Sequence, residues 1–271
     1  MAPKTKKSEE GVAIIDVSSE TISFNVIGTS PLICNSMSAK TQLDLLFPPK
    51  KKRGGNADTL KHDPGNEFNN SIYRSSSDDA PTLIEVLSTS FKKAMAGAAT
   101  DLPGVAKAQV GRLCYVEGDR ISIYGVPQIF MSVVRTAGIQ KTPDIRTRAI
   151  IPRWAAKVTV SFTTPQLSRN EVAKLLGIAG MLQGIGDWRP EKGSGSYGRF
   201  AVVTPNTQAE FDDIVKTGGR LAQVEAMQAP DIYDEETRML LGEFEQRIKD
   251  SGREKDLTYV SVWKGSTLVG A

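Results

Sequence analysis

The chain has little of the chemistry that most enzymes use, because its 271 residues include one histidine and two cysteines. No His or Cys pair has the spacing of a zinc site, so the sequence predicts no metal centre. His62 stands beside Asp63 and Pro64, and we interpret it as a solvated loop residue rather than a catalytic base. Cys34 and Cys114 lie far apart in apolar surroundings, where buried free thiols are expected instead of a disulfide.

Nucleotide-binding motifs are also missing. No segment has the Gly-Lys-Ser/Thr ending of a P-loop. The GIG at residues 184–186 lacks the third glycine of a dinucleotide fingerprint and follows a helical pattern instead of a strand. We therefore expect a protein without a cofactor and without enzymatic activity.

Long apolar runs are absent, and the first residues, MAPKTKKSEEG, lack the apolar segment of a secretory signal. These features predict a cytoplasmic protein with no membrane partner. The net charge is only +3, so any affinity for a polyanion must come from local clustering of cations.

Periodicity and turn signals predict a series of short strands and amphipathic helices. The expected strands cover residues 21–28, 82–87, 113–117, 120–124, 128–135, 154–163, 199–203, 259–263 and 267–269. The strands at 113–117 and 120–124 are joined by Gly-Asp, which is typical of a hairpin. The expected helices cover residues 38–47, 67–74, 91–99, 169–182, 207–216 and 234–249. Ser88 or Ser90 is expected to cap the third of these, and Ser168 with Glu171 to form a capping box on the fourth.

The order of these elements resembles a split β-α-β unit and predicts an α+β fold. We expect a modified ferredoxin-like (RRM-like) antiparallel sheet with helices on one face. Residues 1–12 are expected to be a disordered lead-in. Residues 13–204 would form the RRM-like palm with inserted loops at 48–66 and 136–153, and residues 205–271 a C-terminal helical extension with short strands.

The most informative segment is GIGDWRPEKGSGSYGRF, residues 184–200, which contains five glycines. Glycines let the backbone come close to a ligand or to another backbone segment, because no Cβ is in the way. Arg189, Lys192 and Arg199 add cationic donors, which together with the glycines suit a phosphodiester. A flexible surface loop with solvated charges is the alternative interpretation.

Two further basic clusters strengthen the case for a polyanion. The first is a run, Lys50, Lys51, Lys52 and Arg53, interpreted as a cationic arm or as a solubilising loop. The second has six cations against Asp144 alone, a net charge of +5: Arg135, Lys141, Arg146, Arg148, Arg153 and Lys157. Concentrated positive charge on loops predicts a groove for a polyanion.

Aromatic side chains near these cations offer surfaces for stacked bases. Trp188 and Tyr197 are candidates for stacking, with packing in the core as the alternative. For Phe200 we expect core packing.

Two segments resemble signatures of the RAMP superfamily, the RRM-like RNA-binding subunits of CRISPR effector complexes. GSGSYGRFAV resembles the glycine-rich loop before the final strand, and LSTSFKKAMAGAA resembles the strand end that leads into a helix with Lys and Ala near its start. The chain also resembles a group of tailed-phage proteins with a GIG(D/E)WRPEKGG-type motif beside a GTSPLI-type strand.

The resemblance implies a palm that binds single-stranded RNA or DNA along its backbone, often as a homo-oligomeric row. A phage origin would place the protein in the cytoplasm of an infected bacterial cell. Carried over by position, the strand-end residues facing nucleic acid would be Ser88, Ser90, Lys92 and Lys93. The glycine loop would use Gly193, Gly195, Tyr197, Gly198 and Arg199.

Superfamily members that cut RNA place an aspartate after the first strand, but residues 29–37 contain no acidic residue. We therefore expect a non-catalytic binder of single-stranded nucleic acid. The alternative is a protein-interaction or assembly component, such as a structural phage protein or an inhibitor of a host defence complex, and an RNA-processing nuclease ranks lowest.

Overall fold

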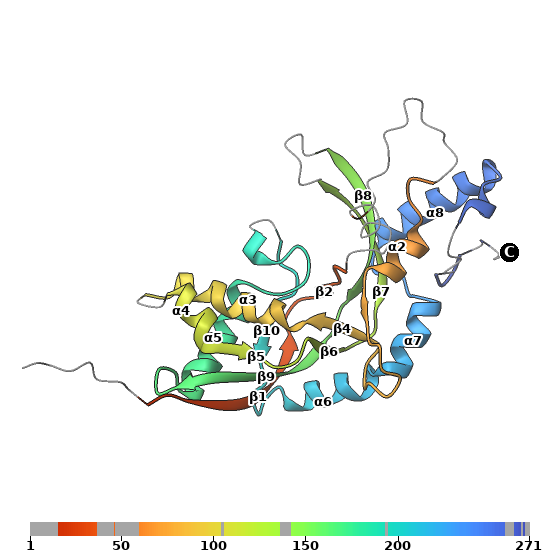
Figure 1. The fold of residues 1–271 in the computed structure, drawn as a ribbon. Helices are drawn as coiled ribbons and strands as arrows, with labels where there is room; N and C mark the ends of the chain where they lie inside the picture. The colour runs from red at the N-terminus through yellow and green to blue at the C-terminus, as the bar shows by residue number, and fades with distance from the viewer. Residues whose placement is uncertain are drawn as a thin grey trace, which may run out of the picture.

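The structure, a computed structural model, describes residues 16–36, 46, 60–103, 106–135, 142–192, 195–257, 263–266 and 268. It is a mixed α and β fold built on a mostly antiparallel sheet (Figure 1). The strands are β1 (Ser18–Gly28), β2 (Leu32–Ile33), β3 (Tyr73–Arg74), β4 (Ile84–Leu87), β5 (Cys114–Val116), β6 (Arg120–Tyr124), β7 (Gln128–Arg135), β8 (Pro143–Ile151), β9 (Ala155–Thr164) and β10 (Phe200–Val202). The helices are α2 (Pro64–Asn70), α3 (Ser88–Ala98), α4 (Lys107–Leu113), α5 (Arg169–Leu182), α6 (Gln208–Thr217), α7 (Arg220–Gln228) and α8 (Glu235–Asp250).

The main sheet has the strand order β10-β1-β9-β6-β4-β3. Its centre is the long antiparallel pair β1 and β9, in register from Ser18 opposite Thr164 to Ile27 opposite Ala155. Alternating residues of both strands, including Phe24 and Phe162, are buried in the core. The strands predicted at 21–28, 128–135 and 154–163 are therefore confirmed as β1, β7 and β9.

β5 and β6 both pair with β9 and not with each other. Cys114 of β5 lies opposite Phe162, and Ile123 of β6 lies opposite Ala156. The hairpin predicted from Gly-Asp is therefore wrong, although both strands exist. Gly118, at φ +78°, makes the turn between two strands that follow one another along the same edge of β9.

Two helices cover the apolar face of the main sheet. α5 begins with the predicted capping box, in which the Ser168 hydroxyl and the Glu171 carboxylate bond each other's backbone N–H. α3 packs beside α5, and its Phe91 meets Phe200 of β10 with ring centroids 5.3 Å apart. Phe200 is therefore a core residue, as expected.

The opposite face of the sheet is covered at one end by α6. Phe211 and Ile214 of α6 pack against Ile27 of β1 and Ala155 of β9. The expectation that helices lie on one face only is therefore wrong, because an amphipathic helix from the C-terminal part buries this end as well (Figure 1). Beyond α6 this face carries the alternate, small polar residues of β1 and β9.

A second sheet, of order β2-β8-β7, projects from the first (Figure 1). The sequence 136–153 was expected to be a connecting loop, yet residues 143–151 form β8, in register with β7 from Gln128 opposite Ile150 to Arg135 opposite Pro143. The apolar residues at 145 and 149–151 are buried or partly buried by this pairing. The sequence interpretation gave weight to the basic residues of this segment as a charged connection, although their alternation with apolar residues is itself typical of a strand.

The loop expected at 48–66 ends earlier than predicted. The helix expected at 67–74 starts instead at Pro64, as α2, with the Asp63 side chain accepting a hydrogen bond from Asn66 N–H. α2 packs against β8, so this segment belongs to the folded body.

The C-terminal part contributes α6 and α8, as predicted, and α7, which was not expected. α8 is fixed to β7 by Thr237, whose hydroxyl accepts a hydrogen bond from Met131 N–H. The expected elements that lie outside the described residues are the lead-in at 1–12, most of the helix at 38–47, most of the strand at 259–263 and most of the strand at 267–269.

Candidate nucleic-acid interface

The glycine loop, which we define as residues 184–199, connects α5 to β10 and folds back on itself. Ile185 N–H donates to Gly198 O at 2.9 Å, and Tyr197 N–H donates to Trp188 O at 3.2 Å. Gly184, Gly186 and Gly198 have φ values of +66°, +78° and +68°, which glycine adopts without a steric cost. The described part of the loop is thus an ordered hairpin-like turn.

The glycine loop is hydrogen-bonded to the segment between β1 and β2. Gly198 N–H donates to Pro31 O at 2.7 Å, and Asp187 N–H donates to Ile33 O at 3.0 Å. Arg199 N–H donates to the hydroxyl of Ser30 at 2.9 Å. The GTSPLI segment and the glycine loop therefore form one structural unit, although about 150 residues separate them in the sequence.

The described glycines serve backbone packing. A Cβ on Gly195 would lie 1.7 Å from Trp188 O, and one on Gly198 would lie 1.8 Å from Ile185 O. These separations exclude any side chain unless the backbone moves. Of the two roles that the sequence left open for these glycines, the structure shows the approach of one backbone segment to another.

An aromatic cluster lies where the glycine loop meets the hairpin of β7 and β8. Phe130 is its buried centre, and we define the aromatic cluster as Phe130, Trp188, Tyr197 and Tyr233. Ring centroids lie 6.3 Å from Phe130 to Trp188, 6.4 Å to Tyr197 and 5.5 Å to Tyr233. The three outer rings are partly buried, so each combines packing against Phe130 with some contact to solvent.

Partial burial also affects the two tyrosine hydroxyls. It raises the pKa of Tyr197, with smaller contributions from Tyr233 and Asp234. Burial raises the pKa of Tyr233 too, and the negative charge of Asp234 adds to this effect. Both phenols are therefore neutral hydrogen-bond donors and acceptors at physiological pH.

Trp188 has a strained backbone. Its φ of +48° is the only positive value at a non-glycine position among the described residues. A bulky side chain in the left-handed region costs on the order of 1–3 kcal/mol. Here the loop's own hydrogen bonds hold this conformation and turn the indole toward Phe130.

Two of the predicted phosphate-binding arginines have partners within the protein. Arg148 of β8 forms an ion pair with Asp187, and burial lowers the pKa of Arg148 despite this neighbour. Arg189 donates from Nε to Glu191 at 2.7 Å and from Nη1 to Gly186 O at 2.8 Å. Both arginines therefore hold the loop through these contacts, and their role in binding a phosphate stays a prediction.

Other predicted cations at this junction are less engaged. Arg146 has a side chain that is 54% exposed, and its Nε lies 3.9 Å from Asp144. It precedes Arg148 by two positions, so both side chains project from the same face of β8 as Phe130 of β7. Arg199 has a buried Nε without a hydrogen-bond partner in the described structure. Arg135 is exposed at the end of β7.

The remaining predicted residues lie elsewhere. Ser88 is buried as the first residue of α3, and its N–H donates to Asp119 O; no side-chain bond from Ser88 or Ser90 caps this helix. Lys92 lies over the ring of Tyr115 in β5, with Nζ 4.1 Å from its centroid, while the neighbouring Lys93 is exposed.

Arg153 and Lys157 are also apart from the aromatic cluster. Arg153 pairs with Asp213 of α6 at 3.1 Å, and Lys157 is exposed on β9. The predicted residues that fall outside the described structure are Lys50, Lys51, Lys52, Arg53, Lys141, Gly193 and the side chain of Lys192.

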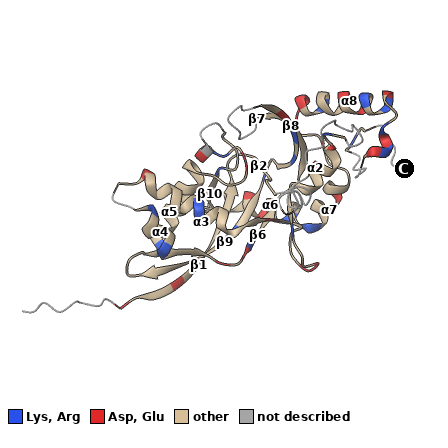
Figure 2. Cartoon of the chain, turned by 45° about the horizontal axis from the view of Figure 1, so that its top comes forward, with Lys and Arg blue, Asp and Glu red and all other residues tan. Residues whose placement is uncertain are grey.

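The described cations do not gather into one basic patch. Figure 2 shows basic positions on α3, on β8 and along α8, with acidic positions between them on α8. The glycine loop contacts the basic segment 136–153 through the Arg148–Asp187 ion pair, but Arg148 and Arg153 are opposed by carboxylates from distant parts of the chain. The sequence count of +5 therefore overstates the positive charge that this region presents.

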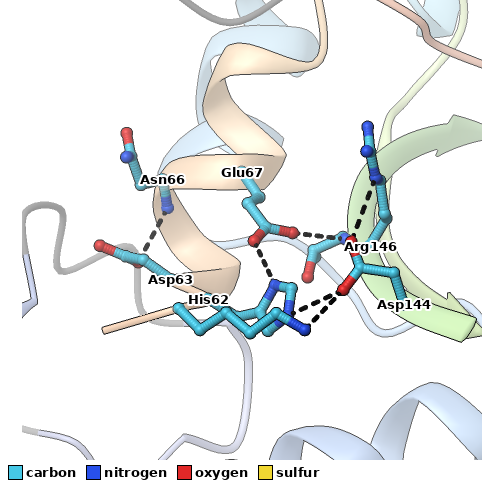
Figure 3. A network of polar contacts seen from close by, with 8 residues as sticks. His62, Asp63, Asn66, Glu67, Asp144 and Arg146 are labelled. Carbon is cyan, nitrogen blue, oxygen red and sulfur yellow. Dashed lines mark hydrogen bonds and ion pairs between the residues drawn. The ribbon is translucent and has the colours of Figure 1, made fainter. Parts of the chain in front are cut away.

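A second polar network joins α2 to β8 (Figure 3). His62 Nδ1 lies 2.9 Å from Glu67, and His62 Nε2 lies 3.4 Å from Asp144. Asp144 also accepts a hydrogen bond from Lys61 at 2.9 Å, which holds the pKa of this carboxyl below its usual range. His62 is thus partly buried and bonded rather than solvated, so that expectation is wrong. With both ring nitrogens facing carboxylates, this histidine has a structural role as a link.

Sequence reasoning missed Tyr233 and Asp187. Tyr233 N–H donates to Ile129 O at 3.0 Å, which fixes the tyrosine beside β7. Its neighbour Asp234 caps α8, and the start of this helix was predicted. The position of Tyr233 directly before a predicted helix cap was therefore the signal that could have pointed to this residue. Nothing in the local sequence indicates that Asp187 pairs with Arg148.

The two cysteines are buried free thiols, as expected. Burial raises the pKa of Cys34 to about 12 and that of Cys114 to about 11, so both are inert at physiological pH.

The described residues contain no cluster of three or more His, Cys, Asp or Glu side chains placed to hold a metal ion. Among the described helices, none has the length and apolar character needed to span a membrane. A comparison with known proteins finds no matching family model and no matching curated sequence.

Proposed function

We propose that this protein is a non-catalytic binder of single-stranded RNA or DNA. The observation that supports this most directly is the aromatic cluster, in which two rings of the glycine loop and Tyr233 from the C-terminal part of the chain surround Phe130. Stacking of a base on an aromatic ring contributes about 1–3 kcal/mol and tolerates any sequence. The partly exposed rings of Trp188, Tyr197 and Tyr233 are the surfaces on which bases would stack.

Arg146 is the cation best suited to contact the phosphates beside these rings. It projects from the same face of β8 as the partly buried Arg148, which pairs with Asp187, and more than half of the Arg146 side chain is exposed. Arg199 and Arg135 are further candidates, since neither forms an ion pair in the described structure. The paired Arg148 and Arg189 would act indirectly, by holding the loop that carries Trp188.

The strand order also supports the proposed ferredoxin-like palm. β10, β1, β9 and then β5 with β6 follow one another across the sheet, all antiparallel. α3 lies between β1 and β5 in the chain, and α5 connects β9 to β10. We infer from this order that the palm consists of two interleaved β-α-β units. A phage protein acting in the cytoplasm of an infected bacterial cell fits this proposal.

The test is fluorescence anisotropy with labelled single-stranded RNA, single-stranded DNA and duplex DNA over a series of salt concentrations. We expect binding to both single strands that weakens with salt, with a slope of about −0.7 for each phosphate neutralised. Arg146→Ala should weaken binding and reduce that slope by about one such unit. Its matched control is Arg169→Ala, an arginine of similar exposure on α5 that pairs with Glu20.

A second pair of variants tests stacking. Tyr233→Leu keeps an apolar side chain but removes the ring, and we expect it to cost about 1–3 kcal/mol of binding. Tyr233→Phe keeps the ring and should bind like the unmodified protein. If no oligonucleotide binds, or if binding does not change with salt, the proposal is wrong. Recovery of a partner protein without nucleic acid in a pull-down would then favour the assembly role.

A further inference from the structure

Within the part of the chain that the structure describes, one edge of β1 is open along most of its length. β10 pairs with β1 only from Val26 to Gly28, whereas β9 pairs with β1 from Ser18 to Ile27 on the other side. In Figure 1 this part of β1 lies along the margin of the sheet. The edge left over is a straight strand, because the register with β9 continues without a bulge.

Hydrogen bonds at the C-terminal end of β1 show which residues face this edge. Gly28 N–H donates toward β9, to Trp154 O at 2.8 Å, whereas Asn25 O accepts on the β10 side, from Val203 N–H at 2.9 Å. Backbone groups of successive residues in a strand point to opposite sides. The backbone N–H and C=O groups of the odd-numbered residues therefore point away from β9, toward the open edge. Before Asn25 in the strand, these residues are Ser19, Thr21 and Ser23.

The outward groups of these three residues have no backbone partner in the described structure. Proteins usually protect such an edge with a proline, a lysine, a bulge or a covering segment. The sequence of β1, SSETISFNVIG, has neither proline nor lysine. Ser19, Thr21 and Ser23 are all exposed, so no described side chain or segment buries them.

We propose that this edge pairs with the same edge of a second copy of the chain, antiparallel about a two-fold axis at Thr21. Thr21 would lie opposite Thr21 of the second copy, and Ser19 opposite Ser23. Each of these pairs exchanges two backbone hydrogen bonds, because the groups of all three residues point outward.

The side chains of the edge suit pairing with themselves. On the open face of the sheet, side-chain hydroxyl groups already form hydrogen bonds between β1 and β9. The hydroxyl oxygens of Thr21 and Ser161 lie 2.7 Å apart, and those of Ser23 and Thr159 lie 2.8 Å apart. Ser19 opposite Ser23 repeats this chemistry between copies. On the other face, Glu20 would lie opposite Ile22 and not opposite a second Glu20, and Glu20 is already paired with Arg169. No like charges therefore meet across the two-fold axis.

Sedimentation velocity of the full chain over a wide range of protein concentration tests this pairing. We expect a monomer–dimer equilibrium. Two double variants place like charges opposite one another, Ser19→Lys with Ser23→Lys, and Ser19→Glu with Ser23→Glu. Each alone should sediment as a single chain, because like charges directly opposite are destabilising in a sheet.

An equimolar mixture of the two double variants should restore the dimer, since every lysine then faces a glutamate. Restoration also shows that both variants are folded. The proposal is overturned if the unmodified chain is monomeric throughout, if either variant alone still dimerises, or if the mixture stays monomeric. It rests on the β1 edge and not on the aromatic cluster, so its failure leaves the nucleic-acid proposal to its own binding assay.

Discussion

Gln223 of α7 connects three parts of the chain in the core, and replacing it should be the most damaging single change we can name. Its side chain is fully buried. Oε1 accepts hydrogen bonds from Leu83 N–H at 2.8 Å and Ile84 N–H at 3.0 Å. Nε2 donates to Ile123 O at 2.7 Å, Gly125 O at 3.0 Å and Gly218 O at 3.1 Å.

The size of the effect follows from these partners. Gln223→Met keeps the length of the side chain and its helix propensity but removes every hydrogen bond. The two backbone N–H groups are then buried without partners, at about 1–3 kcal/mol each. With a smaller contribution from the three carbonyls, we expect a loss of about 3–6 kcal/mol in the free energy of unfolding. That is a large fraction of the 5–15 kcal/mol typical of a domain.

Urea denaturation followed by circular dichroism measures this loss. The matched control is Gln228→Met, which makes the same chemical change at an exposed position of the same helix. We expect the control to change the free energy of unfolding by less than about 0.5 kcal/mol. A loss of under about 1 kcal/mol for Gln223→Met would refute the reasoning, because it would mean that these five hydrogen bonds are not formed or are readily replaced by water.

Two further changes test other parts of the structure. Gly198→Ala should lower the melting temperature markedly, since the new Cβ would lie 1.8 Å from Ile185 O at a φ of +68°. Gly177→Ala, which adds a Cβ in open space on α5, should instead stabilise the folded protein by about 0.5–1 kcal/mol. Equal effects of the two substitutions would contradict this expectation. Asp144→Asn tests the link to Lys61: because the pKa of Asp144 is lowered in the folded protein, its contribution to stability is present above the unfolded pKa and is lost as the pH falls through the folded one. The difference in unfolding free energy between Asp144→Asn and the unmodified protein should therefore be larger near neutral pH than in acid, and a pH-independent difference would show that the ion pair contributes nothing.

Local patterns in the sequence predicted the elements whose signals are local. The capping box of α5 is one example, since Ser168 and Glu171 bond each other within one helical turn. β1 and β9 are others, because apolar and polar residues alternate along both. The strand β8 was missed because Arg146 and Arg148 were counted as part of a basic loop, although they alternate with Ile145, Thr147 and Ala149 as in a strand.

The structural features that the sequence analysis missed depend on partners that are distant in the sequence. β5 and β6 are strands as predicted, but the choice between pairing with each other and pairing with β9 depends on where β9 lies. Gln223 looks like any polar residue of an exposed helix, and only the carbonyls and N–H groups around it show why it is buried.

The candidate interface likewise combines features that have a local sequence signal with features that depend on distant partners. Sequence patterns pointed to the glycine loop and to the basic segment 136–153, and in the structure Asp187 of the loop pairs with Arg148 of that segment. It could not show that Asp187 neutralises Arg148, because an ion pair between loops leaves no periodic signal. Nor could it show that Tyr233 completes the aromatic cluster, since this residue comes from the C-terminal part of the chain.

The central pairing of β1 with β9 has a consequence for how the chain folds during synthesis. Ser18 and its partner Thr164 are 146 positions apart. At about 5–20 residues per second, the ribosome makes the first strand roughly 7–30 s before its partner exists. During that time Phe24 and Val26, which are buried in the folded protein, have no β9 to pack beside them. Closing so large a loop also costs entropy before any contact rewards it, which makes slow folding the expectation for this topology.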